Sequence, residues 1–275
     1  MYKKLQIIVL VALCSFCFAQ NQRFIYEYKF VPNKDEPSDI KEEMMVLETT
    51  KDRSHFFSFT SYKSDSIMRI DLENQLKTTG MINIKKDAQK GLVRYQISKN
   101  YPDFDVFLHT RMMMDRYKVA ESREIKWKIL NESKKVGDWQ VQKAETDFAG
   151  RKWTAWFTTE IPIQDGPYKF HGLPGLIVQI EDATKSHQFE LKGIQRLNGL
   201  TENIFNSKEI SINQKQYAKV LKDYENDPTK GLKMMQMGSV VMKMADGTAP
   251  NMKQEEDNVK ARIAKDNNRI EISLE

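Results

Sequence analysis

The segment Asp165–Asp182, with the sequence DGPYKFHGLPGLIVQIED, constrains the fold of this chain more than any other stretch. Proline fixes φ near the value needed at the second position of a tight turn, and glycine tolerates the positive φ needed at the third. The run Leu173–Leu176 is therefore predicted to form a type II turn. The residues expected to shape this corner and the turn before it are Gly166, Pro167, Gly172, Pro174 and Gly175.

A strand is predicted to follow this turn, because the apolar residues of Leu176–Ile180 are spaced so that every second one shares a face. The simplest interpretation of the turns is a rigid corner between strands, since glycine and proline respond first to backbone demands. The functional interpretation is a loop that holds Tyr168, Lys169 and His171 at a fixed place on the surface, where binding residues often lie.

The first residues have the pattern of a secretory signal peptide. Lys3 and Lys4 form a charged start, Leu5–Phe18 is mostly apolar, and Ala19 supplies a small residue for cleavage. Residues 1–19 are therefore expected to direct export, to the periplasm or to an outer-membrane-associated site. Both cysteines lie in this segment, so residues 20–275 hold no thiol for a disulfide, a nucleophile or a metal.

Residues 20–275 are predicted to form a single domain. Residues 20–205 alternate repeatedly between apolar and polar positions, which indicates a large antiparallel sheet. The expected strands are Phe24–Phe30, Ile40–Thr49, His55–Tyr62, Gly91–Ile97, Asp105–Lys118, Ile125–Leu130 and the hairpin strands Trp139–Phe148 and Lys152–Glu160. The predicted fold class is α+β, mainly antiparallel β, with a strongly twisted sheet or half-barrel and C-terminal helices packed on it.

The pattern changes to helical spacing over residues 206–266. Ser211 and Gln214 suggest a capping box before one amphipathic helix, and Asp227 followed by Pro228 suggests the start of a second. A charged third helix is expected over Lys253–Asp266, and residues 267–275 are expected to form a terminal strand. The apolar stripe of the first helix, which should face the sheet, consists of Tyr217, Val220, Leu221 and Tyr224.

The run Gly172–Ile177 reads GLPGLI and resembles the signature of the GLPGLI family. Upstream features that fit the family in order are Trp127, Lys143-Ala144, Gly150-Arg151, Trp153–Phe157, Ile161-Pro162 and Gly166-Pro167. The ending Asn267–Ile272 is also similar, although Arg269 stands where a proline commonly follows the asparagine pair. The resemblance implies an exported bacterial protein of unassigned activity, and it supplies no catalytic residues.

The predicted hairpin carries further candidates. By alternation Trp153 and Phe157 should face the core, which leaves Trp156 partly exposed for a ligand or a partner, unless the helices cover it. Lys143 and Arg151 flank the same hairpin and could form a polar cluster under the sheet. The alternative is ordinary cross-strand ion pairing, worth less than about 1 kcal/mol at a surface.

The methionine clusters and the histidines are the candidate metal ligands of this chain. Exported copper proteins use methionine thioethers, but methionine also fills irregular cores and adaptable grooves. The clusters are Met112–Met114, Met234, Met235, Met237, Met242 and Met244. The four histidines are scattered, and the sequence contains no zinc, phosphate-loop, nucleotide or nucleophile-elbow motif. We therefore expect no metal site, no cofactor and no catalytic residue.

These patterns favour a non-enzymatic binding protein for an apolar small molecule or an envelope protein. The 43 basic and 38 acidic residues are interspersed, so nucleic acid is not expected as a partner. The candidate binding residues are Trp156, Tyr168, Lys169, His171, Lys143 and Arg151. Two alternatives remain open: a copper-handling protein that uses the methionine clusters, and a hydrolase. An apolar cavity under the helices would favour binding, whereas His171 and Lys169 beside carboxylates in a pocket would favour hydrolysis.

Overall fold

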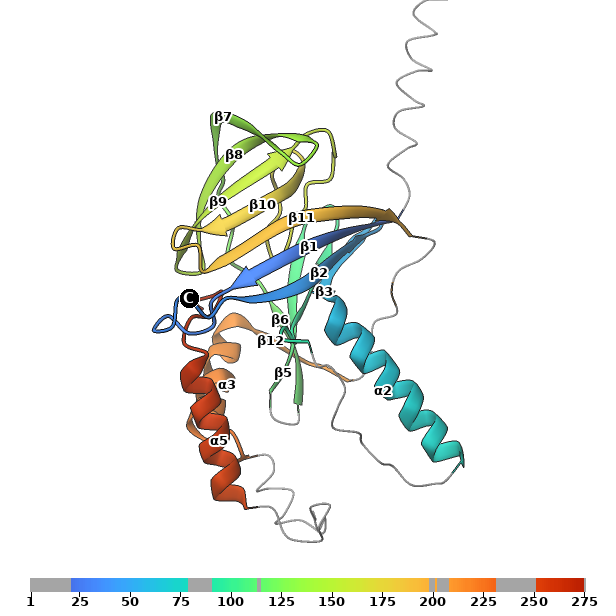
Figure 1. Cartoon of the computed structure of the whole chain (residues 1–275), viewed down its shortest axis with the longest axis vertical. Helices are drawn as coiled ribbons and strands as arrows, with labels where there is room; N and C mark the ends of the chain where they lie inside the picture. Colours follow the sequence, from blue (N-terminus) through green and yellow to red (C-terminus); the bar gives the residue numbers. More distant parts are fainter. Residues whose placement is uncertain are drawn as a thin grey trace, which may run out of the picture.

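The computed structural model describes residues 21–78, 91–112, 115–197, 201, 208–230 and 251–274. Within these ranges one twelve-stranded sheet dominates and three helices flank it (Figure 1). The strands are β1 (Gln22–Phe30), β2 (Lys41–Thr49), β3 (Arg53–Ser58), β4 (Gln96–Asn100), β5 (Asp105–Met112), β6 (Asp115–Ala120), β7 (Lys128–Val136), β8 (Trp139–Phe148), β9 (Arg151–Thr158), β10 (Leu176–Asp182), β11 (His187–Arg196) and β12 (Ile210–Asn213). The helices are α2 (Phe59–Thr78), α3 (Gln214–Asn226) and α5 (Met252–Lys265).

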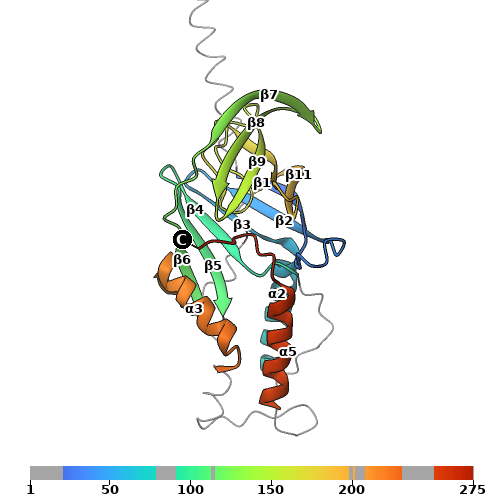
Figure 2. The ribbon, with the colours of Figure 1, turned by 90° about the vertical axis from the view of Figure 1, so that its left-hand side faces the viewer.

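The strand order is β12-β6-β5-β4-β3-β2-β1-β11-β10-β9-β8-β7. Every neighbouring pair is antiparallel except β12 with β6, and the sheet does not close, because β12 and β7 are its two edges. The sheet curls strongly, so that β4, β5 and β6 stand at a steep angle to β8 and β9 (Figure 2). The predicted α+β class with a twisted antiparallel sheet is confirmed.

The core fills the inside of this curl. In β1, Phe24, Tyr26 and Tyr28 are all buried, because alternation places them on one face of the strand. Neighbouring strands place such rings side by side: Tyr28 stacks on Phe189, its cross-strand partner on β11, with ring centroids 4.1 Å apart. Alternating aromatic residues therefore build the core from the central strands outward.

The β8–β9 hairpin agrees closely with the sequence prediction. Its two-residue turn, Ala149-Gly150, has φ of +55° and +82°, which suits the twist of antiparallel strands. Trp153 and Phe157 are buried, and Trp156 is half-buried on the opposite face. The arrangement expected for these three aromatic residues is therefore confirmed.

Several expected strands differ in the structure. The segment expected as one strand over His55–Tyr62 is β3 followed directly by α2, and Asp105–Lys118 is divided between β5 and β6. The expected terminal strand over residues 267–275 is also wrong, because residues 267–274 form no strand. They lie instead as an extended strap whose polar atoms bond to the sheet and its loops, for example from the Ile272 amide to the Ala149 carbonyl at 2.9 Å.

Helix α3, the first helix of the C-terminal part, begins two residues later than the sequence suggested. Ser211 belongs to β12, and the capping box of α3 is formed by Asn213 and Gln216. The stripe formed by Tyr217, Val220, Leu221 and Tyr224 packs against the core, as predicted, and α5 confirms the third expected helix. The expected helix after Pro228 and its methionines Met234, Met235, Met237, Met242 and Met244 lie outside the described residues, as do residues 1–19.

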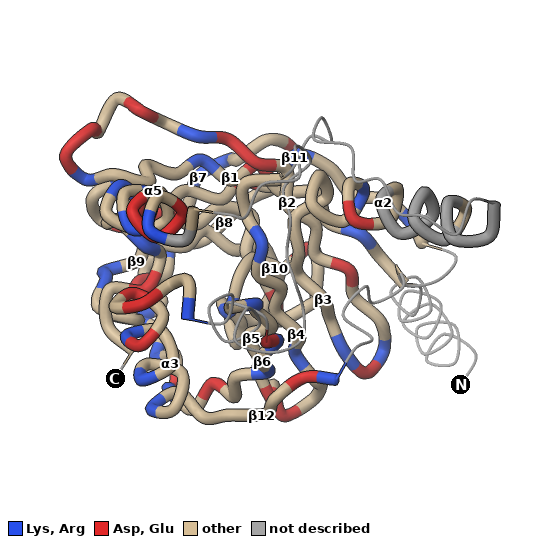
Figure 3. The backbone as a smooth tube through the Cα atoms, turned by 90° about the horizontal axis from the view of Figure 1, so that it is seen from below, with Lys and Arg blue, Asp and Glu red and all other residues tan. Residues whose placement is uncertain are grey.

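Charged residues of both signs are spread over the described part of the chain. Basic and acidic residues are interspersed along the helices and the outer strands when the molecule is viewed from below (Figure 3). In the part of the chain that the structure describes, no helix is both long enough and apolar enough to cross a membrane.

Candidate functional site

The segment between β9 and β10, residues 159–175, folds into the concave side of the sheet, and we call it the GLPGLI loop. Phe170 and Leu173 are fully buried, and Phe170 contacts the Trp153 ring edge-on with centroids 4.7 Å apart. The sequence analysis placed Tyr168 and Lys169 on the surface, but these side chains are buried as well. The surface placement is therefore wrong: apolar residues at 170 and 173 draw the segment into the core.

The turn at the GLPG sequence is tighter than a type II turn. The Gly175 amide donates to the Leu173 carbonyl at 2.7 Å, whereas the Leu176 amide donates to Ile161 at 3.0 Å. The φ of Gly175 is +158°, positive but far from the value near +80° that a type II turn requires. Glycine is needed here because a Cβ would collide with the backbone carbonyl of Thr158.

The earlier glycines of the segment have separate roles. A Cβ on Gly166 would overlap the side chain of Ile177, so close packing against β10 excludes larger residues. Gly172 has φ of +90° but an open surrounding, and its amide bonds to the Gln164 carbonyl. Between them the Pro167 carbonyl accepts from the Phe170 amide at 3.2 Å. These bonds and contacts fix the path of the loop.

A buried ion pair anchors the start of the same loop. The Lys99 ammonium contacts the Asp165 carboxylate and donates to the carbonyls of Gly166 and Phe170 at 2.7 and 3.0 Å. Asp165 also accepts from Ser54, Tyr101 and the Gly166 amide. Burial lowers the pKa of Lys99, and the adjacent carboxylate opposes that shift. The charges have hydrogen-bond partners on several sides, so this centre is built to hold the loop.

A second charged cluster joins the loop to the C-terminal strap. Lys169 Nζ contacts Glu121 at 2.7 Å and Glu271 at 2.5 Å, and Arg123 pairs with the same two carboxylates. The Tyr168 hydroxyl donates to Glu271 at 2.6 Å. Burial alone would raise the pKa of Glu121, but the bonds from Arg123 and the charge of Lys169 hold it at about 2. The two cations and two carboxylates neutralise one another.

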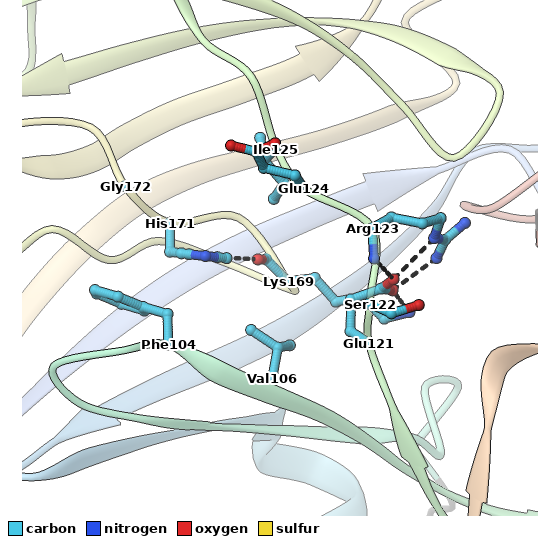
Figure 4. Close-up of a pocket in the computed structure, with 10 residues that line it drawn as sticks. All are labelled: Phe104, Val106, Glu121, Ser122, Arg123, Glu124, Ile125, Lys169, His171 and Gly172. Atoms are coloured by element: carbon cyan, nitrogen blue, oxygen red, sulfur yellow. Dashed lines mark hydrogen bonds and ion pairs between the residues drawn. The ribbon is translucent and has the colours of Figure 1, made fainter.

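A hollow of about 320 Å³ opens beside this cluster (Figure 4). Its lining comes from the start of β5, from the chain after β6 and from the GLPGLI loop. The residues are Phe104, Val106, Glu121, Ser122, Arg123, Glu124, Ile125, Lys169, His171 and Gly172. The His171 ring stacks on Phe104 with centroids 4.6 Å apart, and Phe104 has the unusual φ of +56° for a bulky residue. An aromatic pair therefore forms one wall of this small hollow.

The surroundings of His171 favour its neutral form and select one tautomer. Burial lowers its pKa, and its Nδ1 lies 2.8 Å from the Lys169 carbonyl. Because a carbonyl only accepts, Nδ1 must carry the proton, which leaves Nε2 as a hydrogen-bond acceptor. Nε2 has no hydrogen-bond partner among the described residues, so it can receive a proton or a hydrogen bond from a guest in the small hollow.

A larger hollow of about 540 Å³ lies between the sheet, α3 and the C-terminal strap. Aromatic and aliphatic side chains alternate with polar ones around it. The lining residues are Tyr28, Phe30, Leu92, Val93, Arg94, Tyr95, Leu108, Thr110, Arg111, Tyr168, His187, Tyr217, Leu221, Tyr224, Asp266, Asn268, Arg269, Ile270, Glu271, Ile272 and Leu274. Figure 2 shows the strap running from α5 across the curl toward β6, so the chain end forms part of this wall.

One polar atom beside the large hollow lacks a partner among the described residues. The Tyr95 hydroxyl is buried and makes no hydrogen bond with them, although its ring packs edge-on against Tyr168. A buried polar atom without a hydrogen bond lowers the stability of the fold by about 1–3 kcal/mol. A ligand that forms a hydrogen bond with the Tyr95 hydroxyl would remove this cost.

His187 connects the floor of the large hollow to the strap. Its Nε2 lies 2.9 Å from the Asn268 carbonyl and its Nδ1 lies 2.7 Å from the Tyr28 hydroxyl. The carbonyl requires a proton on Nε2, so Nδ1 accepts from Tyr28. Burial and the nearby Arg151 charge lower the pKa of His187 to about 4. This histidine is therefore neutral over the physiological range of pH.

The other predicted binding residues lie apart from both hollows. Arg151 is buried, pairs with Asp182 at 3.0 Å and donates to strap atoms of Asn268 and Arg269, so it fastens the chain end to β9. Lys143 pairs with Glu132 of the neighbouring strand β7 at 3.3 Å and with Glu145 of its own strand β8 at 3.2 Å, which is ordinary surface ion pairing. Trp156 is covered on one side by the Lys134 ammonium, 4.1 Å from the ring centre.

The structure thus divides the six predicted residues. Lys169 and His171 line the small hollow, and Tyr168 lines the large one, whereas Trp156, Lys143 and Arg151 line neither. Their role in binding stays a prediction. Sequence reasoning missed Lys99, although alternation with the buried Ile97 placed it on the core face of β4. A lysine at an apolar position in a strand was the available signal.

Among the described residues, no group of three or more histidine, aspartate or glutamate side chains is placed so that it could hold a metal ion. The methionine clusters lie mostly elsewhere. Met112 is buried in β5, and residues 113–114 lie outside the described ranges. The copper alternative is therefore untested.

Comparison with known proteins gives one family match and a related fold. Residues 145–179, which include β9 and the GLPGLI loop, match the sequence model of a family described as "Protein of unknown function (Porph_ging)". No curated protein matches the chain.

Two solved structures, both titled as PNGF-II, share the fold. They superpose with TM-scores of 0.51 and 0.52 at 14% and 15% identity. Each alignment covers 75% of this chain but only 34% of the solved chain, so the present protein spans about a third of that length. At this identity the likeness concerns the fold alone.

Proposed function

We propose that this protein is a binding protein that holds an apolar or amphipathic small molecule in the large hollow between the sheet and α3. The observation that carries the proposal is the half-buried apolar stripe of α3. Tyr217, Leu221 and Tyr224 pack against the core only in part, because the remainder of each side chain borders the hollow. A guest would cover the area that the protein leaves exposed.

The size and lining of the hollow support this role. A volume of about 540 Å³ lies in the range of roughly 300–1,000 Å³ that is common for small-molecule sites. Tyrosines supply most of the aromatic wall, and each combines an apolar ring with a polar end. A protein segment inserted under α3 is the other occupant that such a lining suits, and binding measurements separate the two.

The proposal extends to where the protein works. We place it among the exported GLPGLI-type proteins, acting in the periplasm or at an outer-membrane-associated site after removal of residues 1–19. The GLPG sequence at residues 172–175 and the charged and apolar pattern at the N-terminus support this assignment. N-terminal sequencing of protein from its own cells tests it: a mature chain that begins at residue 20 is expected, and a retained or lipid-modified start would contradict it.

Titration with N-phenyl-1-naphthylamine, a neutral apolar fluorophore, tests the binding role. The wild-type protein should increase the fluorescence of the probe in a saturable manner. Leu221→Trp should reduce the affinity at least about tenfold, because the larger ring fills the space that the probe would occupy. Lys222→Trp is the matched control, since this neighbouring side chain is exposed and does not line the hollow.

The outcomes are separable. Saturable binding that Leu221→Trp weakens and Lys222→Trp leaves unchanged supports the large hollow as the site. Absence of saturable binding to the wild-type protein, or equal binding by both variants, contradicts the proposal. The thermal midpoints of both variants show whether either substitution has unfolded the protein.

Hydrolysis in the small hollow is a second candidate. The observation in its favour is the free Nε2 of neutral His171 beside Glu121 and Lys169. Against it, Lys169 and Glu121 are held in ion pairs, and a pKa of about 2 makes Glu121 a weak base. Turnover of a chromogenic ester that His171→Gln abolishes would support this candidate, and turnover that His171→Gln leaves unchanged would remove it.

A further inference from the structure

Among the described cations in and around the two hollows, most are paired with carboxylates. Lys99 contacts Asp165, and Lys169 and Arg123 share Glu121 and Glu271. The cations nearer the strap are satisfied in the same way: Arg151 by Asp182 at 3.0 Å and Arg269 by Glu225 at 2.6 Å. A cation without a carboxylate is therefore an exception in this part of the molecule.

Arg94 and Arg111 are that exception. Both line the large hollow, and neither guanidinium makes an ion pair or a hydrogen bond with any described residue. They reach it from different segments, Arg94 from the chain before β4 and Arg111 from β5. An anion bound at this place would supply the partner that each of these two guanidinium groups lacks among the described residues.

The polar groups around the two arginines leave room for such an anion. Of the two carboxylates that line the hollow, Glu271 is held by Lys169, Arg123 and Tyr168. The other is Asp266, whose pKa is raised by partial burial of its carboxylate, a shift that the charge of Arg269 opposes. Neither carboxylate forms an ion pair with Arg94 or Arg111. The guanidinium groups are exposed at the mouth, whereas the buried tyrosines form the floor.

We infer that the ligand of the large hollow is an anionic amphiphile. Its carboxylate or phosphate group lies at the mouth on Arg94 and Arg111, and its apolar body extends inward between the tyrosines and Leu221. Guanidinium groups bind both kinds of anion through paired N–H donors. The unpartnered Tyr95 hydroxyl offers a further donor inside the hollow. This inference rests on the proposed function, because it assigns the chemistry of the same site.

Displacement of N-phenyl-1-naphthylamine tests the inference with three competitors of equal chain length: dodecanoate, dodecyl phosphate and dodecanol. At neutral pH the two anions should displace the probe at about tenfold lower concentrations than dodecanol. The double variant Arg94→Gln/Arg111→Gln should remove most of this difference while leaving the affinity for dodecanol nearly unchanged. Lys152→Gln is the control for loss of positive charge, since it lies on β9 and lines neither hollow.

The results distinguish this inference from the function on which it rests. If the probe binds but dodecanol competes as well as both anions, the inference is wrong and the binding role remains. The Lys152→Gln variant could lose the preference for anions over dodecanol as fully as the double variant. The preference would then come from the overall positive charge of the protein and not from a site at Arg94 and Arg111, and the inference would again be wrong. A stronger effect of the carboxylate or of the phosphate identifies which of the two anionic groups is recognised. Failure of the probe itself to bind contradicts the proposed function.

Discussion

The GLPGLI loop and the helix-covered hollow lie on the same concave surface, but they treat polar groups in opposite ways. In the loop, the buried charges of Lys99 and Asp165 have hydrogen-bond partners on several sides. In the hollow, the Tyr95 hydroxyl is buried without a hydrogen-bond partner among the described residues. Polar groups that have all their hydrogen bonds fix one conformation, whereas a group without a partner can bond to a ligand. We infer that the most recognisable sequence motif is structural, and the binding site that we propose lies beside it.

Removing the charge of Asp165 should produce the largest effect. Asp165→Asn leaves the Lys99 ammonium buried without a counter-charge, so the free energy of unfolding should fall by about 3–5 kcal/mol. Urea unfolding measures this change. The matched control is Asp147→Asn, an exposed carboxylate paired with Lys152, for which a loss below about 1 kcal/mol is expected. Equal losses for the two variants would show that the loop is not held as described.

Substitution of the motif glycines should separate two kinds of requirement. Gly175→Ala should cost about 3 kcal/mol or more, because the new Cβ collides with the Thr158 backbone, which cannot move without disturbing β9. Gly172→Ala should cost only about 1 kcal/mol, since its surroundings are open and only its positive φ is unfavourable. Thermal or urea unfolding ranks the two. The reverse order would contradict the close approach at Gly175.

Acid should destabilise the wall of the hollow through His187. Its folded pKa of about 4 lies below the ordinary value near 6.5, so between these pH values the unfolded chain binds a proton that the folded protein does not. Stability should therefore fall as the pH is lowered from 6.5 to 4, with a slope of up to about 1.4 kcal/mol per pH unit from this residue.

Unfolding measured across that range checks the slope, and His187→Gln should reduce it. His55, whose pKa burial also lowers to about 4, should continue to contribute in that variant. A pH dependence that His187→Gln leaves unchanged would show that the histidine titrates normally and that the strap is not fastened through it.

The smallest effect on stability is expected at Tyr95. Tyr95→Phe removes a hydroxyl that has no partner among the described residues, so the free energy of unfolding should change by less than about 0.5 kcal/mol or rise slightly. The affinity for an anionic amphiphile should nevertheless fall. Tyr168→Phe is the contrasting variant, because it removes a bond to Glu271 at 2.6 Å and should destabilise the protein by about 1 kcal/mol or more. A large loss for Tyr95→Phe would indicate a missed structural bond.

The extent to which the sequence predicted these features follows from how local they are. Strand alternation and the Ala149-Gly150 turn depend on neighbouring residues, so the hairpin and the exposure of Trp156 could be predicted. The inward path of the GLPGLI loop depends on distant partners such as Lys99, which only the folded sheet brings to Asp165. The prediction of a terminal strand fails for the same reason, since the Arg151 side chain binds the carbonyls of Arg269 and Ile270 and no described strand pairs with this segment.

The hollow could be anticipated only in part. The apolar stripe of α3 indicated a helix that packs on the sheet, and the structure places that stripe against the core. Periodicity shows which side of a helix is apolar, but it does not show how closely that side meets the sheet. The sequence did not single out Arg94 and Arg111. Whether an arginine has an ion-pair partner depends on which residues the fold brings near it, and the sequence alone does not show this.

Hydrogen exchange of the intact protein, with and without a saturating apolar ligand, tests the central claim most directly. The account predicts that in the free protein the amides of α3 exchange much faster than those of residues 165–175, because the helix lies over a hollow whereas the loop is largely buried and several of its amides are hydrogen-bonded. The ligand should slow exchange in α3 by at least about tenfold and leave the loop unchanged. Equal protection of both regions in the free protein, or slowing confined to the loop, would contradict the account.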